Sequence, residues 1–282
     1  MKRLVLVLAV VVTVVSAGAA AWLWLRPVDQ QHALARIQQL GGKVHVEEAA
    51  PDRPVTRIDL KDCPATDNDL DLLSAFPHLH YLTLIGTRVS GEGLKRLSAL
   101  KELHGLGLSG PAAGGDGLRH LSGSMALHEL RLESIAFTDA GLTHLSRLIS
   151  LEALELADVP LRDEDLPHLT ALLNLQRLTL HRTALTNAGV ARLTALHGLE
   201  ELSLSSPRIG DAGMVYLKEL KNLQELSLAD SAVSDAGLVH LKTLTQLHEL
   251  DVSNTRVTEV GLAELRKAMP GAFIYRTSEP RP

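Results

Sequence analysis

A period of 24 residues runs through most of this 282-residue chain without a slip. In each copy two aliphatic residues alternate with polar or small ones, which is the pattern of a strand with one buried face. The pairs are Ile58/Leu60, Leu82/Leu84, Leu106/Leu108, Leu130/Leu132, Leu154/Leu156, Leu178/Leu180, Leu202/Leu204, Leu226/Leu228 and Leu250/Val252. A fixed period of this length is typical of solenoids. The chain is therefore predicted to form a stack of similar units.

A second segment with the chemistry of a helix start follows most of these strands. It reads TDAGL at 138–142, TNAGV at 186–190, SDAGL at 234–238 and TEVGL at 258–262. Thr and Ser are good helix N-caps, and an acid in the first turn complements the helix dipole. Leucines at helical spacing come next, as in Leu142, Leu145 and Leu148. Each unit is thus predicted to be a short strand, a turn and a short helix, which buries its apolar face only by stacking on its neighbours.

The pattern L-x-x-L-x-L followed by T-D-A-G-L-x-x-L resembles the leucine-rich-repeat superfamily, and most closely the short bacterial repeat of 24 residues. It is more distantly similar to the cysteine-containing repeats of F-box substrate receptors. The resemblance covers residues 55–276 and implies an α/β solenoid, with a curved parallel sheet inside and short helices outside. Two departures stand out. The column that holds Asn in many family members begins here with Cys63, and the glycine column is broken by Asp69 and Asp165.

The N-terminus predicts a hydrophobic helix that reaches a membrane. Lys2 and Arg3 precede an uncharged run over residues 4–25, with Trp22 and Trp24 near its far end. About 20 apolar residues span the ~30 Å hydrocarbon core, and indoles favour the interface. An uncleaved anchor would keep the two basic residues inside and place the repeats outside the cytoplasm. The alternative is a cleaved signal peptide, since residues 16–21 are small, and a secreted or periplasmic protein.

Four regions follow from these patterns: an anchor or signal segment at 1–26, an N-terminal cap at 27–54, the solenoid at 55–276 and a tail at 277–282. The cap is predicted as a helix over Gln31–Leu40 and a strand over Lys43–Glu48. A tenth repeat strand is due at Ala272–Tyr275, because Ile274 follows Leu250 by 24 residues. The turn over residues 109–115, with three glycines, is the expected weak point of the stack.

The candidate binding surface is the inner, concave face. Strands stack about 4.8 Å apart and helices about 8–10 Å apart, so the array must curve with its strands inside. Three columns of residues between or just beyond the buried leucines are predicted to face the concavity. The candidate binding residues on it are Tyr81, Arg131, Glu155, Arg177, His181, Glu201, Glu225, Glu249 and Asp251. Acid gathers toward the C-terminus, which fits a basic protein partner or, alternatively, carboxylates that only stay solvated.

Catalytic, metal and cofactor sites are not predicted. No nucleophile elbow, phosphate-binding loop or dinucleotide fingerprint occurs. His120, His144 and His168 form a column, but helices 8–10 Å apart hold them too far from one zinc ion, whose ligand nitrogens lie at about 2.1 Å. Cys63 is the only cysteine and fits a small buried position. The net charge of -5 argues against a nucleic-acid partner.

These observations favour a non-catalytic protein-interaction module, membrane-anchored or secreted, that binds a partner on its concave face. One alternative is a structural spacer of the cell envelope without a specific ligand. A further alternative, implied only by the F-box resemblance, is a substrate-adaptor-like role. An enzyme would need a convergent catalytic site, and the sequence shows none.

Overall fold

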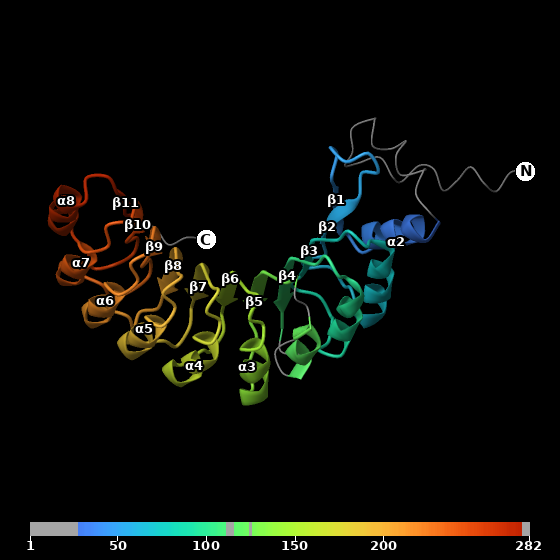
Figure 1. Cartoon of the computed structure of the whole chain (residues 1–282), viewed down its shortest axis with the longest axis horizontal. Helices are drawn as coiled ribbons and strands as arrows, with labels where there is room; N and C mark the ends of the chain where they lie inside the picture. The colour runs from blue at the N-terminus through green and yellow to red at the C-terminus, as the bar shows by residue number, and fades with distance from the viewer. Residues whose placement is uncertain (1–27, 111–115, 124–125, 278–282) are drawn as a thin grey trace, which may run out of the picture.

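The computed structural model describes residues 28–110, 116–123 and 126–277, and it shows a curved solenoid of stacked strand–helix units. Its described residues form one eleven-stranded sheet in which spatial order follows sequence order from β1 to β11. The sheet lines the inside of the arc and the helices lie outside, with α2 (Val28–Gln39) and α8 (Glu259–Ala268) at opposite ends of the arc (Figure 1). This confirms the predicted fold over the repeats.

The strands repeat at the predicted period. They are β1 (Lys43–Val46), β2 (Val55–Asp59), β3 (Tyr81–Leu84), β4 (Gly105–Ser109), β5 (Glu129–Glu133), β6 (Ala153–Ala157), β7 (Arg177–His181), β8 (Glu201–Ser205), β9 (Glu225–Ser227), β10 (Glu249–Asp251) and β11 (Phe273–Tyr275). From β2 onward all pairs are parallel, and each residue pairs with the one 24 positions later, as in Leu82↔Leu106 and Leu250↔Ile274. The strand expected near Ile274 is therefore present.

The outer layer changes character along the chain. The first three repeat units carry 3₁₀ helices: η1 (Asp67–Ala75), η2 (Gly93–Ala99) and η3 (Asp116–Leu121). The later units carry α-helical turns, with one 3₁₀ turn: α3 (Asp139–Leu145), η4 (Asp163–Asp165), α4 (Leu166–Leu169), α5 (Asn187–Leu193), α6 (Asp211–Leu217), α7 (Asp235–Leu241) and α8 (Glu259–Ala268). The predicted caps are confirmed where Thr138, Ser234 and Thr258 accept backbone N–H groups of their own helices.

The N-terminal end of the leucine core is closed by α2 (Val28–Gln39) and by β1, which pairs antiparallel with β2. Gln30 donates from Nε2 to the Ala75 carbonyl at 2.8 Å, and Arg36 pairs with Asp69 at 2.8 Å, so the helix is fastened to η1. Between the two layers lies an almost wholly aliphatic core, in which Phe76 is a rare aromatic side chain. Cys63 is buried there, with Sγ 3.5 Å from the Lys61 carbonyl.

A ladder of carboxylates joins the helix starts of neighbouring repeats. Asp211 accepts the Ser234 N–H at 2.7 Å and the Ser234 hydroxyl at 2.6 Å, although the two residues are 23 positions apart. The same arrangement joins Asp67 to Ser90, Asp163 to Thr186, and Asp235 to Thr258, while Asn187 accepts the Gly210 N–H. The acid of the repeat motif therefore fastens one unit to the next, besides any effect on its own helix dipole.

The motif has glycine at this position because the carboxylate of the preceding repeat occupies the space that a Cβ atom would need. A Cβ built on Gly237 or Gly261 would lie closer than 3.0 Å to the acid of the preceding repeat, Asp211 or Asp235. The two exceptions follow from the same chemistry. Where Asp165 replaces the glycine, its own Oδ2 accepts the Arg162 N–H at 2.8 Å, and Asp69 does so for Thr66. In these two repeats, Asp69 and Asp165 accept the N–H group that the acid of the preceding repeat accepts elsewhere.

Some predictions fall outside the described residues. They concern the apolar segment 4–25, the part of the third-repeat turn at 111–115, and the tail beyond 277. Among the residues that are described, no helix has both the length and the apolar character needed to cross a bilayer.

Candidate functional site on the concave sheet face

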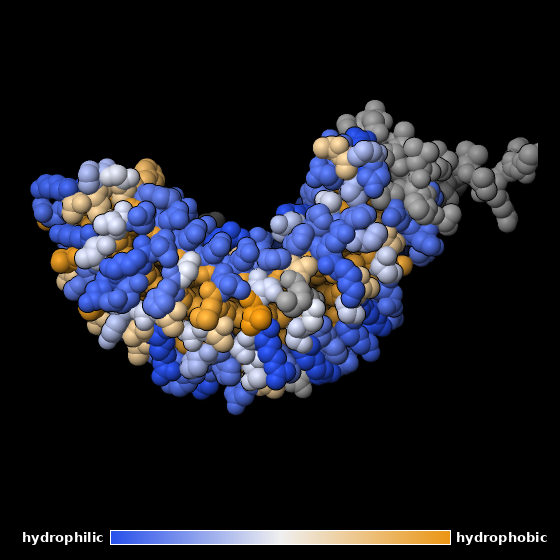
Figure 2. All heavy atoms as spheres, in the orientation of Figure 1, coloured by the Kyte–Doolittle hydropathy of each residue, from blue (hydrophilic) through white to orange (hydrophobic). Residues whose placement is uncertain are grey.

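Two adjoining hollows lie on the concave face. The larger, of about 530 Å³, spans β2 to β8, and the smaller, of about 150 Å³, spans β7 to β11. Tyr81, Arg131, Glu155, Arg177 and Glu201 line the first; Glu201, Glu225, Glu249 and Asp251 line the second. Hydrophilic residues cover the rim of the concavity on the side shown in Figure 2. The structure thus places eight of the nine candidate residues in these hollows; His181 lines neither.

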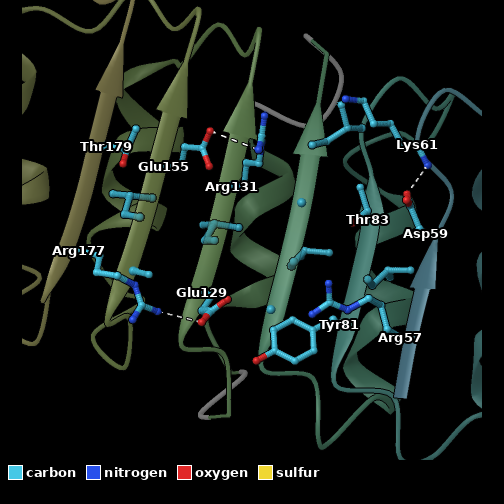
Figure 3. Close-up of a pocket in the computed structure, with 18 of the residues that line it drawn as sticks. Arg57, Asp59, Lys61, Tyr81, Thr83, Glu129, Arg131, Glu155, Arg177 and Thr179 are labelled. Atoms are coloured by element: carbon cyan, nitrogen blue, oxygen red, sulfur yellow. Dashed lines mark hydrogen bonds and ion pairs between the residues drawn. The ribbon is translucent and has the colours of Figure 1, made fainter. Parts of the chain in front are cut away.

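Charges in the middle of the face are paired with one another (Figure 3). Arg131 lies 3.4 Å from Glu155 and 3.5 Å from Glu133. Arg177 on β7 reaches Glu129 on β5 at 2.9 Å, because the residue between them in the column is the short Ala153. The middle is therefore close to neutral, and its charged groups hold each other in place.

The C-terminal part of the face differs from the middle in how its charges are paired. Glu201, Glu225 and Glu249 stand directly side by side on β8, β9 and β10. Glu249 accepts a hydrogen bond from the Tyr275 hydroxyl at 3.1 Å, but no ion pair joins Glu201 or Glu225 to a cation in the described part of the chain. Like charges on adjacent strands destabilise a sheet. Partial burial, and then the neighbouring Glu225, raise the pKa of Glu201 above its ordinary 4.5.

We expect Glu201→Gln to make the isolated protein slightly more stable at pH 7, by a few tenths of a kcal/mol. The folded-state pKa of Glu201 exceeds its unfolded value, so ionisation disfavours folding as the pH rises through both values. The wild type therefore has no such penalty below the unfolded pKa near 4.5. Urea unfolding at pH 7 and pH 4 should show the stabilisation shrinking at the lower pH. A loss of stability at pH 7 would contradict this.

Two details of the predicted face need correction. The third column, which runs from Lys61 to Ser253 in steps of 24, is open to the concavity only in part, because Ala157, Ser205, Ala229 and Ser253 are buried where the chain turns away from the strand. Asp251 is also buried, at 1% exposure, and accepts the Ser253 N–H at 2.8 Å. Its carboxylate therefore holds the turn after β10, which distinguishes it from the open glutamates beside it.

Three features that lie on this face or at its edge were not expected from the sequence. Tyr275 adds an aromatic hydroxyl at the C-terminal end, in the column of Asp251. Arg57 and Lys61 line the opposite end. His80, His104 and His128 form a stack one position before the strands, with ring centroids 4.8 and 5.8 Å apart. Adding 24 along that column would have found the histidines.

In the described residues no group of three or more His, Cys, Asp or Glu side chains is arranged to hold a metal ion. His78 and His80 instead face Glu102, at 3.0 and 3.5 Å.

No protein-family model matches the chain, and no curated protein matches it. Similar solved structures include two internalins from Listeria monocytogenes. One (inlF) is 17% identical with a TM-score of 0.47, over 75% of this chain and 71% of that one. The other (inlC2) is 24% identical with a TM-score of 0.46, over 76% of this chain and 84% of that one. Neither likeness bears on the partner of this chain, which has to be argued from its own residues.

Proposed function

We propose that this protein is a non-catalytic protein-interaction module that binds a basic partner on its concave face. The observation that carries the proposal is the column Glu201–Glu225–Glu249, in which the first two side chains form no ion pair in the described structure, although Arg177 stands beside Glu201 on β7. In the middle of the same face, Glu129 and Glu155 each have an arginine. Lysine or arginine side chains of a partner would relieve the repulsion along the column, and that relief adds to the affinity.

We further propose that residues 4–25 hold the solenoid at a membrane with the repeats outside the cytoplasm, or direct its export before cleavage. The support is the uncharged run with Lys2 and Arg3 before it. The cap at 27–54 then joins this segment to the repeats. A distant similarity to F-box receptors stays a prediction of the sequence pattern alone.

A spacer of the cell envelope without a specific ligand is the second candidate. The paired middle of the face favours it, because Arg131 and Arg177 are already bound to carboxylates. The face is also poor in aromatic anchors, which supply much of the energy of tight interfaces. A binding role on this surface is therefore expected to depend on charge and to weaken as salt is added.

Site-specific photo-crosslinking in native envelopes distinguishes an interaction module from a spacer. A photoreactive residue replaces Ser203, which lines the acidic hollow, or Val239, which is 55% exposed on the outer helix α7. We expect one defined protein adduct from position 203, removed by high salt, and none from position 239. A spacer would give only diffuse background from both positions. A defined adduct from position 239 alone would place the interface on the outer surface and contradict the proposal.

A further inference from the structure

The N-terminal end of the concave face carries two cations that the rest of the face does not neutralise. Arg57 and Lys61, on and just after β2, are exposed and line the larger hollow. In the described residues no ion pair joins either side chain to a carboxylate. Asp59 lies between them, but its Oδ1 accepts the Lys61 backbone N–H at 2.9 Å. This end of the face therefore has the opposite character to the glutamate column.

Arg57 is held in position by an aromatic ring. Its guanidinium carbon lies 4.6 Å from the ring centroid of Tyr81, on the next strand. Stacking of this kind fixes the plane of the guanidinium and leaves its N–H groups at the edge, where they match a carboxylate. Less side-chain entropy is then lost when a ligand binds. Lys61, two residues after the end of β2, adds a second cation, which is labelled at the upper right of Figure 3.

Glycine explains both the ring's position and the room beside it. A Cβ on Gly105 would lie closer than 3.0 Å to the Tyr81 ring, so the ring rests against a residue without a side chain. Gly107, two residues along β4, likewise leaves the sheet bare between Thr83 and Arg131. Backbone of a ligand can approach the sheet here, and β4 separates the stacked Arg57 from the paired charges of β5 and β6.

We propose that the partner is an extended segment with an acidic end over Arg57 and Lys61 and a basic end over Glu201 and Glu225. This deepens the proposed function and rests on it. The two ends fix one orientation of the segment along the solenoid, because reversing it would bring like charges together at both ends. The span from β2 to β9 is seven strand steps, or about 34 Å at about 4.8 Å per step, which about 10 extended residues cover.

The test uses the full-length protein in detergent and a synthetic peptide of roughly 12 residues. The peptide has a glutamate block, a Gly-Ser spacer and a lysine block, and is made in both chain directions. Two other ligands are tested for comparison: a peptide that carries lysines only, and the sulfated polysaccharide heparin. Binding is measured by fluorescence anisotropy, and a nitroxide on the glutamate block locates that end by broadening of nuclear resonances.

We expect the nitroxide to broaden resonances of β2 and β3 and to leave those of β8 and β9 sharp. Arg57→Ala should weaken the two-block peptide about tenfold, as expected for one charge-assisted contact, and leave the lysine-only peptide unchanged. Lys95→Ala, an exposed lysine on η2, is the matched control and should change neither.

Three results would overturn the inference. If the lysine-only peptide binds as tightly as the two-block peptide, the glutamate column works alone, and the proposed function survives without the acidic anchor. If heparin occupies Arg57 and Lys61 more tightly than the peptide, the ligand at this end is an anionic polysaccharide. If neither peptide binds, both this inference and the proposed basic partner fail.

Discussion

Replacing Asp211 by alanine is expected to lower the free energy of unfolding by about 2 kcal/mol. Its carboxylate accepts both the N–H and the hydroxyl of Ser234, which begins the next helix, so the variant leaves the start of α7 without its partner from α6. Gly237→Ala should cost about as much, because its new methyl group would lie closer than 3.0 Å to the same carboxylate. Urea unfolding, with the slope of the transition unchanged, measures both.

The combination of the two changes separates a specific contact from general damage. With Asp211 already alanine, the methyl group at position 237 meets a smaller side chain, so the double variant should be at least 1 kcal/mol more stable than the sum of the single effects predicts. Asp139→Ala is the matched control. It has the same place in the motif, but Arg162 stands where the next hydroxyl would be, and Arg162 uses Asp165. Equal losses at 139 and 211, or strict additivity, would contradict the ladder.

The period alone located the strands and their register, because each column of a solenoid is fixed by adding 24. The ladder of carboxylates between neighbouring repeats could not be predicted in the same way, for a physical reason. Asp211 and Ser234 each fit a role in their own helix, and only the stacked geometry shows that they also bind one another. The sequence showed the glycine column and its two interruptions, but not why glycine is needed there. Its true constraint is the preceding carboxylate, which explains why Asp69 and Asp165 are tolerated.

The candidate site was predictable as a surface, and its pairings were not. Alternation identified Arg177 and Glu129 as residues of one face, but their contact skips a strand and depends on the short Ala153 between them. Burial of Asp251 likewise depends on the turn that follows β10. The length of a side chain and the course of the next turn decide such pairings and burial, and the repeat pattern of the sequence specifies neither.

Reversing the acidic column is expected to lower affinity for the crosslinked partner by at least about 100-fold, or roughly 2.7 kcal/mol. In Glu201→Lys/Glu225→Lys, two cations would face the basic partner on adjacent strands, where like charges cost several kcal/mol. The reversed residues still line an open hollow, so folding should be retained. The neutral variant Glu201→Gln/Glu225→Gln should lie between the two in affinity.

The most direct measurement is the affinity of that partner for the reversed variant and for Glu219→Lys, side by side at low salt. Glu219 is exposed in the turn after α6, so its reversal changes the net charge without touching the concave face. We expect the affinity to fall by at least about 100-fold in the reversed variant and to stay close to wild type in Glu219→Lys. Equal affinities in the two variants, with both proteins folded, would contradict the claim that the glutamate column holds the partner.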